Sequence, residues 1–543
     1  MMKKILLGNE AIIQGALSAG VSYVSGYPGC PSAEIGDDFA KIAAKNGVYV
    51  EWATNEKVGL ESAIGASFSG LKSLVNMKSF GINVCSDSLL PLAYTGTKGA
   101  MVIVVADDPS CWSSAQTEQN TRAYSQFGHI PTLEPADPQE CYDFTKLAFE
   151  ISEKFNTPVI LHTTTRVNHQ KMPVLYEEIR NPNIEIRKGE FVKDPHRFTT
   201  MPPRTLEQKK ELLEKIKKIQ TFAEKSKVNK IDLSKNKVGI VVSGVSYLHV
   251  KEALEELKLN LPILKLGFFY PLPEEKIKKF IKPLKKLLVV EELDNYLERE
   301  INVLTRSINP KLQIFGKNLL PVIGELNTEK IYIALAKITG RKFPEFKIKN
   351  LKLKIPNRTA RLCEGCPYWY VFPTLKRVAP DAIFTGDIGC NMIAGFAPHN
   401  IQDTLFSMGA SLGIAHGVSK STNQKVISIM GDGTFFHAGI SPLLNAVYNK
   451  SKPLMIILDN RITAMTGHQQ NPGMGKTLMG EVTTEVSIEE IARACGVKNV
   501  KVLDPINIKE LESTVKEFLA KDEVSLIICK RICALLERRQ AKK

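Results

Sequence analysis

Two short polar clusters follow apolar segments in the C-terminal part of the chain. Val426–Met430 leads into Gly431-Asp432-Gly433, and Leu454–Leu458 leads into Asp459-Asn460. One helix, expected over roughly 439–448, fits between the two segments. Both clusters should therefore lie at the same edge of adjacent parallel strands, where such sheets bind ligands. A carboxylate and an amide oxygen placed together are suitable ligands for a hard divalent cation such as Mg²⁺.

The expected cation site is also suited to a diphosphate. Asp432, Asn460 and the backbone carbonyl of Ile462 are predicted to hold Mg²⁺, which would bridge two phosphates while the glycines let the backbone approach them. This order of strand, Gly-Asp-Gly turn, helix, strand and Asn is typical of thiamine diphosphate sites. The alternative is a Gly-Asp-Gly turn with no ligand, which the position of Asn460 argues against. Further cofactor contacts are predicted at Gly409, Gly431, Gly433, Thr434, Thr463, Met465 and Thr466.

Thiamine diphosphate also needs a carboxylate beside N1′ of its aminopyrimidine ring. That carboxylate favours the 4′-imino form, which deprotonates carbon C2 of the thiazolium ring. Glu56, at the start of a helix expected over about 57–68, is the candidate. The alternative is a carboxylate that only stabilises the N-terminus of its helix. The residues alone do not separate these two roles.

The chain as a whole is organised to place these sites on α/β domains. Short apolar strands alternate with helical patterns along its 543 residues, which predicts an α/β fold of three doubly wound, mostly parallel-sheet domains. We expect the following division: a domain over 1–190, a linker and exposed helix over 191–236, a domain over 237–341, a linker over 342–356 and a domain over 357–543.

The composition narrows the class of protein. The 43% apolar and 24% charged fractions are ordinary for a soluble globular protein, and no apolar run approaches the roughly 20 residues that span a bilayer. The apolar stretch after the N-terminal lysines is too short for an export signal, so a cytoplasmic location is expected. The net charge of +15 indicates Lys-rich helix faces, or alternatively a face that docks an acidic electron carrier. The lysines lack the interleaved aromatic residues of a nucleic-acid platform, so no nucleic-acid partner is expected.

Several segments in order along the chain carry a common pattern. They are Gly8-Asn-Glu-Ala-Ile12, Ser25-Gly-Tyr-Pro-Gly-Cys-Pro-Ser32, Asn55-Glu-Lys-Val58, Val105-Ala-Asp-Asp-Pro-Ser110, Gly386-Asp-Ile-Gly-Cys390, Met430-Gly-Asp-Gly-Thr-Phe-Phe-His437 and Thr463-Ala-Met-Thr-Gly-His468. Together they resemble the alpha subunit of indolepyruvate:ferredoxin oxidoreductase, within the 2-oxoacid:ferredoxin oxidoreductase family. The resemblance implies that the three domains are, in order, pyrimidine-binding, transketolase-C-like and diphosphate-binding.

The same resemblance implies an activity and partners. The activity is oxidative decarboxylation of an aryl 2-oxoacid such as indolepyruvate, with coenzyme A as acyl acceptor and ferredoxin as electron acceptor. A beta subunit normally completes the enzyme. The resemblance also makes Glu56 the partner of N1′.

The resemblance further implies a group of residues on the substrate side. They are Cys30, Arg122 and His468, with His437 near the diphosphate or the substrate. Arg122 is suited to pair a carboxylate bidentately, and with Glu56 and His437 it is a predicted catalytic residue. Surface or structural roles are the alternatives for Arg122 and for both histidines. Cys30 stands where the family usually has Thr, which leaves the identity of the 2-oxoacid open.

Five of the ten cysteines form a candidate path for electrons. Cys363 and Cys366 form a Cys-x-x-Cys, Cys390 follows Gly-Asp-Ile-Gly, and Cys529 and Cys533 lie late in the chain. The wider family implies a [4Fe–4S] cluster on Cys363, Cys366, Cys390 and Cys533, with Cys529 as the alternative fourth ligand. Zinc or no metal are the other possibilities. The family's usual C-terminal ferredoxin-like domain, with its cysteine runs, is not found in this sequence. We therefore expect a separate iron–sulfur subunit or a soluble ferredoxin to accept the electrons.

Two other functions remain open at this point. A non-oxidative thiamine diphosphate-dependent 2-oxoacid decarboxylase would need no cluster, and the order of the four cysteines argues against it. A non-catalytic scaffold subunit would keep only the fold. The presence of Glu56, Asp432 and Asn460 argues against that function.

Overall fold

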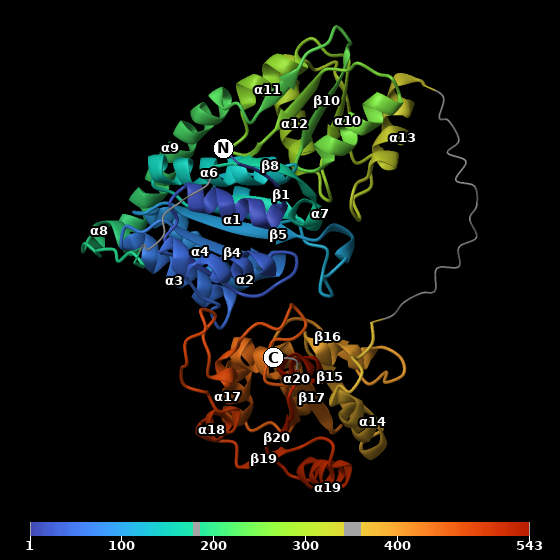
Figure 1. Ribbon diagram of the computed structural model, residues 1–543. Coiled ribbons are helices and arrows are strands. Elements are labelled where there is room, and N and C mark those ends of the chain that lie inside the picture. The colour runs from blue at the N-terminus through green and yellow to red at the C-terminus, as the bar shows by residue number, and fades with distance from the viewer. Residues whose placement is uncertain (1, 178–184, 342–359, 542–543) are drawn as a thin grey trace. The chain divides into compact units, whose positions relative to one another are not determined.

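The computed structural model describes residues 2–177, 185–341 and 360–541, in two compact units that are considered separately (Figure 1). Unit 1 spans Met1–Lys349 and unit 2 spans Asn350–Lys543. The linker expected over 342–356 lies outside the described residues, as does the start of the third predicted domain at 357–359. Among the described helices, none combines the length and the apolar composition needed to cross a lipid bilayer.

The first sheet of unit 1 has seven strands in the order β12-β6-β7-β5-β4-β2-β3. Its strands are β2 (Tyr23–Gly26), β3 (Tyr49–Val50), β4 (Ser73–Lys78), β5 (Met101–Asp107), β6 (Thr132–Leu133), β7 (Val159–Thr164) and β12 (Phe268–Tyr270). All pairs are parallel except β12 with β6. The central strand β5 is buried along its whole length, as expected for a Val- and Ile-rich strand covered on both faces.

Helices cover both faces of this sheet. They are α1 (Gly8–Ser18), α2 (Ala33–Ile42), α3 (Glu56–Phe68), α4 (Ser79–Thr95), α5 (Arg122–Gly128), α6 (Pro138–Phe155) and α7 (Thr165–His169). In Figure 1, α1 and α6 lie on one face and α3 and α4 on the other. Strands β1 (Met2–Leu7) and β8 (Lys171–Tyr176) form a separate two-stranded antiparallel sheet. A short α8 (Pro195–Phe198) lies between β8 and α9 in the sequence.

The second sheet of unit 1 has five strands in the order β14-β13-β10-β11-β9. They are β9 (Lys230–Asp232), β10 (Val238–Ser243), β11 (Ile263–Leu266), β13 (Lys286–Val290) and β14 (Gln313–Phe315). Only the edge strand β9 is antiparallel to its neighbour. The accompanying helices are α9 (Arg204–Lys225), α10 (Ser246–Glu256), α11 (Glu274–Ile281), α12 (Tyr296–Ile308) and α13 (Thr328–Thr339).

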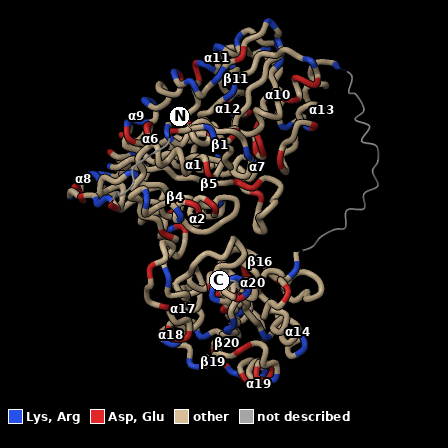
Figure 2. The backbone as a smooth tube through the Cα atoms, viewed as in Figure 1, with Lys and Arg blue, Asp and Glu red and all other residues tan. Residues whose placement is uncertain are grey.

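Three elements differ from the expected division of the chain. Strand β9 lies in the segment expected to be linker, and β12 follows β11 in the sequence yet pairs with β6 of the first sheet. Helix α9, expected to be exposed, buries one face that includes Leu212 and Ile219. Its lysines remain on the outer face, and Figure 2 shows Lys and Arg along α9 and α11. This helix is therefore amphipathic, and its apolar face is part of the fold.

Unit 2 contains a six-stranded, fully parallel sheet in the order β16-β15-β17-β18-β20-β19. The strands are β15 (Ile383–Gly386), β16 (Thr404–Leu405), β17 (Val426–Gly431), β18 (Leu454–Asp459), β19 (Asn499–Leu503) and β20 (Ser525–Lys530). Its main helices are α14 (Tyr368–Val378), α15 (Ala410–Ser421), α17 (Ile440–Tyr448), α18 (Ile488–Ala494), α19 (Ile508–Leu519) and α20 (Ala534–Ala541).

The core of unit 2 explains why its sheet is doubly wound. Alternate residues of β17 enter different apolar clusters: Ile427 and Ile429 belong to one, and Val426 and Met430 to the other. Because successive side chains of a strand point to opposite faces, both faces of the sheet must be covered. The α/β class and the mostly parallel sheets predicted from the sequence are confirmed.

Candidate active site

Asp432 and Asn460 lie side by side at the carboxyl edge of the unit 2 sheet. Each follows its strand directly, and the parallel register pairs Gly431 with Leu458. Both side chains are buried, with 4% and 6% exposure. The helical chain that begins at Asp432 starts at this edge and leads through a π-helical turn (Phe435–Gly439) into α17. The strand–turn–helix–strand arrangement predicted from the sequence is therefore present.

The glycines of this site lie so close to neighbouring segments that a side chain would collide with them. A Cβ at Gly433 would lie 2.8 Å from Oγ1 of Thr463, and one at Gly409 would lie 2.5 Å from the carbonyl oxygen of Ala438. Gly409 also has a φ of +86°, which favours glycine. The predicted contacts Gly409, Gly433 and Thr463 thus surround the turn that carries Asp432.

The charge of Asp432 is strongly affected by its surroundings. Burial, and then the neighbouring carboxylate of Asp459, raise the pKa of Asp432 to about 7. Asn471 donates a hydrogen bond from Nδ2 to Asp432 Oδ2 at 2.9 Å. A buried carboxylate with one amide partner is suited to a cation ligand, because a bound cation would offset the cost of burying its charge. The Asn460 side-chain oxygen accepts a hydrogen bond from the Ile462 amide at 3.2 Å, which shapes the turn after β18.

Two residues of this site were not predicted from the sequence. Asn471 holds Asp432, although it lies 39 residues along the chain. Asp387 is fully buried and accepts hydrogen bonds from the amides of Gly409 and Ser411. Asp387 belongs to the Gly-Asp-Ile-Gly segment, so the sequence contained a motif that could have identified it. No local sequence pattern identifies Asn471.

The cysteines predicted to hold a cluster line one pocket of unit 2. Its volume is about 250 Å³, and its lining includes Cys363, Cys366, Cys390 and Cys533. Met465 and His468 also line it, and His468 Nε2 lies 3.7 Å from the sulfur of Cys533.

The two late cysteines differ in position. The Cys533 amide donates a hydrogen bond to the carbonyl oxygen of Asn460 at 3.0 Å, so this cysteine lies next to the predicted cation site. Cys529 instead lies within β20 and packs into the apolar core. Cys533 is therefore the better placed of the two alternatives.

No group of three or more His, Cys, Asp or Glu side chains in the described residues is arranged to hold a metal ion. This finding bears differently on the two predicted centres. The predicted Mg²⁺ site would use one carboxylate, one amide oxygen, a backbone carbonyl and phosphate oxygens of a ligand, so it is not a group of that kind. The four thiols surround a pocket of about 250 Å³ instead of converging on one point. Burial raises the pKa of Cys366 to about 11 and that of Cys390 to about 12.

Glu56 lies at the carboxyl edge of the first sheet in unit 1. The side chain of Asn55 caps helix α3 by accepting a hydrogen bond from the Val58 amide at 2.9 Å. The Glu56 side chain is buried, with 7% exposure, against the first turn of α4. A Cβ at Gly81 would lie 2.6 Å from Glu56 Cγ and 3.0 Å from Oε1. Asn55 therefore supplies the N-cap hydrogen bond of α3, and Glu56, in the first turn of this helix, remains the predicted partner of N1′.

Arg122 occupies a buried ion pair. Its Nε and Nη2 donate to the two carboxylate oxygens of Glu134, at 2.6 and 3.1 Å, and its Nη1 donates to the carbonyl oxygen of Glu292. The buried ring of His162 lies between the carboxylates of Glu134 and Asp107 and forms a hydrogen bond with each. The guanidinium of Arg122 is thus fully engaged inside the protein. The predicted pairing with a substrate carboxylate would require this ion pair to open.

Replacing Arg122 with Met should destabilise unit 1. Removal of one partner leaves the Glu134 carboxylate buried without its main counterion, which costs about 3–5 kcal/mol. Urea denaturation followed by circular dichroism measures the loss. Arg166→Met is the control, because its ion pair with Glu325 is partly exposed and should contribute less than about 1 kcal/mol. An Arg122→Met protein as stable as the parent would show that the buried pair is not structural.

The remaining predicted residues lie near these centres. His437 is buried in the π-helical turn that follows the Gly-Asp-Gly turn. Thr434 is buried in the first helical turn, and its hydroxyl donates to the carbonyl oxygen of Ile388. Thr466 lies beside Gln469 in the segment after Asn460. Cys30 is half-buried in the loop between β2 and α2, and burial raises the pKa of its thiol.

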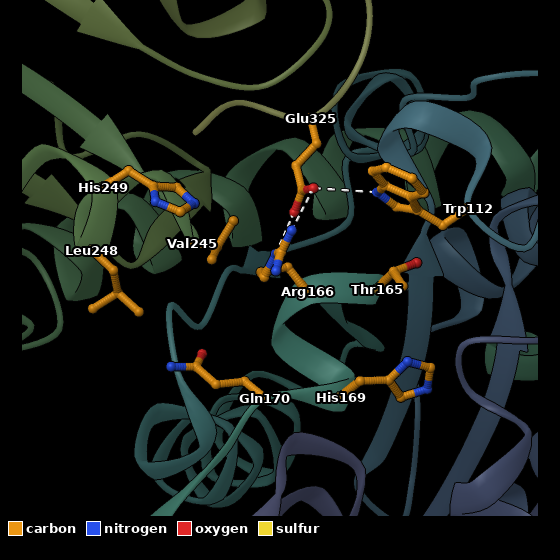
Figure 3. A pocket seen from close by; sticks show the side chains of 9 residues that line it. All are labelled: Trp112, Thr165, Arg166, His169, Gln170, Val245, Leu248, His249 and Glu325. Atoms are coloured by element: carbon orange, nitrogen blue, oxygen red, sulfur yellow. Dashed lines mark hydrogen bonds and ion pairs between the residues drawn. The ribbon is translucent and has the colours of Figure 1, made fainter. Parts of the chain in front are cut away.

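A larger pocket of unit 1 contains none of the predicted site residues. Its volume is about 590 Å³, and it lies between α7 and the start of α10. Figure 3 shows Arg166 and Trp112 both directed at the Glu325 carboxylate. Arg166 Nε and Nη2 donate to Glu325 at 2.5 and 2.7 Å, and Trp112 Nε1 donates at 3.2 Å.

Two known protein families, both described as binding thiamine diphosphate, match different parts of the chain. A family described as "Thiamine pyrophosphate enzyme, C-terminal TPP binding domain" matches residues 387–529. A family described as "Pyruvate flavodoxin/ferredoxin oxidoreductase, thiamine diP-bdg" matches residues 14–229. These ranges contain Asp432 and Glu56 respectively, and they confirm thiamine diphosphate as the predicted cofactor.

Similar curated proteins cover nearly the whole chain. Indolepyruvate oxidoreductase subunit IorA of Methanothermobacter thermautotrophicus is 42% identical, over 98% of this chain and 87% of the relative. The subunit of the same name from Pyrococcus horikoshii is 41% identical, over 98% of this chain and 86% of the relative. A solved 2-oxoglutarate:ferredoxin oxidoreductase from Magnetococcus marinus aligns with a TM-score of 0.51 at 18% identity, over 62% of this chain and 65% of that chain. The last likeness shows the fold alone.

Proposed function

Because this chain belongs to the family of indolepyruvate oxidoreductase IorA subunits, we propose that it is the thiamine diphosphate-bearing subunit of a 2-oxoacid:ferredoxin oxidoreductase. The substrate is an aryl 2-oxoacid such as indolepyruvate, and the products are an acyl-coenzyme A, CO₂ and reduced ferredoxin. The observation that carries the proposal is the placement of Asp432 and Asn460 at the ends of neighbouring parallel strands. The domains over 1–190, 237–341 and 357–543 are then pyrimidine-binding, transketolase-C-like and diphosphate-binding.

The residues present fit a Mg²⁺–diphosphate group. Asp432, Asn460 and the carbonyl of Ile462 would hold the cation, because carboxylate, amide and carbonyl oxygens are the ligands that Mg²⁺ takes beside phosphate oxygens. Thiamine diphosphate, when bound, supplies an acidic carbon and an electron sink for decarboxylation of a 2-oxoacid. Glu56 would be the carboxylate that shares a proton with N1′ of the aminopyrimidine ring.

The cysteine pocket fits an iron–sulfur cluster. Cys363, Cys366, Cys390 and Cys533 would bind it, and [4Fe–4S] clusters are held by four thiolates. Such a cluster, when bound, supplies one-electron redox chemistry. The pocket also contains Asn460 and His468, so the thiols lie beside the cofactor residues of the same unit. A beta subunit, coenzyme A and a ferredoxin or iron–sulfur subunit are the proposed partners.

One assay separates this function from its alternatives. The anaerobically purified chain and its beta subunit are incubated with Mg²⁺, thiamine diphosphate, coenzyme A, a viologen dye and a panel of 2-oxoacids. We expect dye reduction that requires coenzyme A and is fastest with aryl 2-oxoacids. Aldehyde release without dye reduction would identify a non-oxidative decarboxylase. Failure to bind thiamine diphosphate in calorimetry would identify a scaffold subunit.

Asp432→Asn should weaken cofactor binding. The substitution keeps the shape of the side chain but removes the charge that would hold Mg²⁺, so we expect thiamine diphosphate affinity to fall by roughly 10- to 100-fold. Calorimetry in the presence of Mg²⁺ measures the change. Asp522→Asn, at an exposed surface ion pair with Lys452, is the control and should bind as the parent does. Equal affinity in the parent and Asp432→Asn would remove Asp432 from the cation site.

A further inference from the structure

The side chain of Lys78 packs against the loop that carries Cys30. It is the last residue of β4, whose neighbour β2 ends at Gly26 just before this loop. A Cβ at Gly29 would lie 2.8 Å from Lys78 Cβ, so only glycine lets the loop rest on the alkyl stem of the lysine. The position of the Lys78 side chain is thus determined by packing.

The side chain of Lys78 is half-buried, and its ammonium has few partners within the protein. Its Nζ donates to the carbonyl oxygen of Ser113 at 3.1 Å and lies 5.1 Å from the ring centre of Phe80. Among the described residues, no carboxylate lies within ion-pair distance of it. An ammonium has three N–H groups, so two are left for another acceptor. Burial lowers the pKa of Lys78, and the nearby charge of Asp108 partly offsets that effect.

The nearby carboxylate of Asp108 is committed to other donors. Its Oδ2 accepts hydrogen bonds from the Ser113 amide at 2.7 Å and from the Ser114 hydroxyl at 2.7 Å. Its Oδ1 accepts from the Thr165 hydroxyl at 2.6 Å. Asp108 therefore stabilises the loop that follows β5. The hydrogen-bond acceptor of the Lys78 ammonium is a backbone carbonyl oxygen, that of Ser113.

Other cations near the carboxyl edge of this sheet already have anionic partners. Arg122 is paired with Glu134 in the protein interior, and Arg166 is paired with Glu325. The His169 ring lies 3.4 Å from Glu34. Lys78 differs from these cations because, among the described residues, no carboxylate lies within ion-pair distance of it; Asp108 is close enough only to interact through space.

Lys78 is also close in the fold to the proposed N1′ carboxylate. It precedes α4, and Gly81 in the first turn of that helix contacts Glu56. Under the proposed function Glu56 acts on the cofactor, and Lys78 is a cation at the same end of this sheet. The neutral thiol of Cys30 is a weak donor and does not offset a negative charge.

We propose that Lys78 binds the carboxylate of the 2-oxoacid substrate, beside Cys30. This inference rests on the proposed function and replaces Arg122 as the cation for that carboxylate. The ion pair is strongest before decarboxylation, because the leaving group loses its charge as CO₂ forms. Lys78 therefore contributes to substrate affinity and orientation more than to the rate of bond cleavage.

Two substitutions separate charge from loop anchoring. Lys78→Gln keeps an N–H donor for the Ser113 carbonyl but removes the charge, and Lys78→Arg keeps the charge. With the holoenzyme and an aryl 2-oxoacid, we expect Lys78→Gln to raise KM by roughly 10- to 100-fold with a smaller change in kcat, and Lys78→Arg to recover most of the affinity. Lys72→Gln is the control, since Lys72 lies just before the start of β4, away from Lys78, and pairs with Glu153; its KM should not change.

A binding measurement that needs no turnover completes the test. An aryl propionate and its primary amide are titrated into the holoenzyme by calorimetry. The parent should prefer the acid by at least about tenfold, and Lys78→Gln should bind the two equally. If Lys78→Gln keeps both the parental KM and the preference for the acid, Lys78 only anchors the loop and the proposal is wrong. Failure of the proposed function is a different result, because the parent itself would then oxidise no 2-oxoacid.

Discussion

Glu56→Gln is expected to lower turnover by roughly 100- to 10,000-fold while thiamine diphosphate binding stays at the parental level. Glutamine has the shape of glutamate but cannot exchange a proton with N1′, so the bound cofactor would not be activated. The contact between Glu56 and Gly81 is preserved by this isosteric change, so the fold around α3 and α4 should not alter. Steady-state assays give the turnover, and calorimetry gives the cofactor affinity.

The control for this experiment lies on the same helix. Glu61→Gln removes a carboxylate that is exposed and accepts a hydrogen bond from the Ser88 hydroxyl. It should turn over as the parent does. A Glu56→Gln protein with parental activity would show that another group activates the cofactor.

Cys390→Ser and Cys533→Ser should each abolish the reduction of viologen dye and remove most of the bound iron and acid-labile sulfide. Both cysteines line the pocket that also holds the Cys363–Cys366 pair, and a cluster that loses one of four thiolates is not retained in full. We expect dye reduction to fall by at least about 100-fold, since chemistry at the cofactor would then lack an electron acceptor. Iron and sulfide analysis on anaerobically purified protein measures the cluster directly.

Cys529→Ala is the matched control for the late cysteine. Cys529 packs into the core of unit 2 from β20 and does not line the pocket, so its loss should leave iron content unchanged. Loss of iron in Cys529→Ala together with its retention in Cys533→Ser would reverse the assignment of the fourth ligand. Stoichiometric zinc in the parent would exclude the cluster altogether.

The strand and turn arrangement that places Asp432 beside Asn460 was predictable because its determinants are local. Strands β17 and β18 begin where the apolar runs predicted them, and α17 begins one residue from its expected start. The period of a buried strand and the Gly-Asp-Gly turn are set by neighbouring residues, and parallel pairing then places Asp432 and Asn460 together. Asn471 was missed because its hydrogen bond to Asp432 depends on the path of the loop after β18.

The substrate side was harder to predict because charge pairing is a property of the tertiary structure. Arg122 stands in a polar segment and has the right chemistry for a carboxylate, yet the fold places Glu134 and Glu292 around its guanidinium. Lys78 has no motif of its own, and its availability follows from what surrounds it: Asp108 bonded to its own loop and Gly29 packed on its stem. Sequence spacing reports neither burial nor the partners that a charge finds.

The Asp432–Asn460 pair, the α/β class and the position of Glu56 at a helix start were determined by the sequence itself, since turn chemistry and hydrophobic periodicity act over a few residues. The tertiary structure alone decided that β12 joins the first sheet, that one face of α9 is buried, and that Cys533 rather than Cys529 lines the cysteine pocket. The same holds for Lys78, because only the fold decides that no carboxylate of the described residues forms an ion pair with it. These outcomes depend on contacts between distant segments, where burial and the cost of an uncompensated charge decide which groups meet.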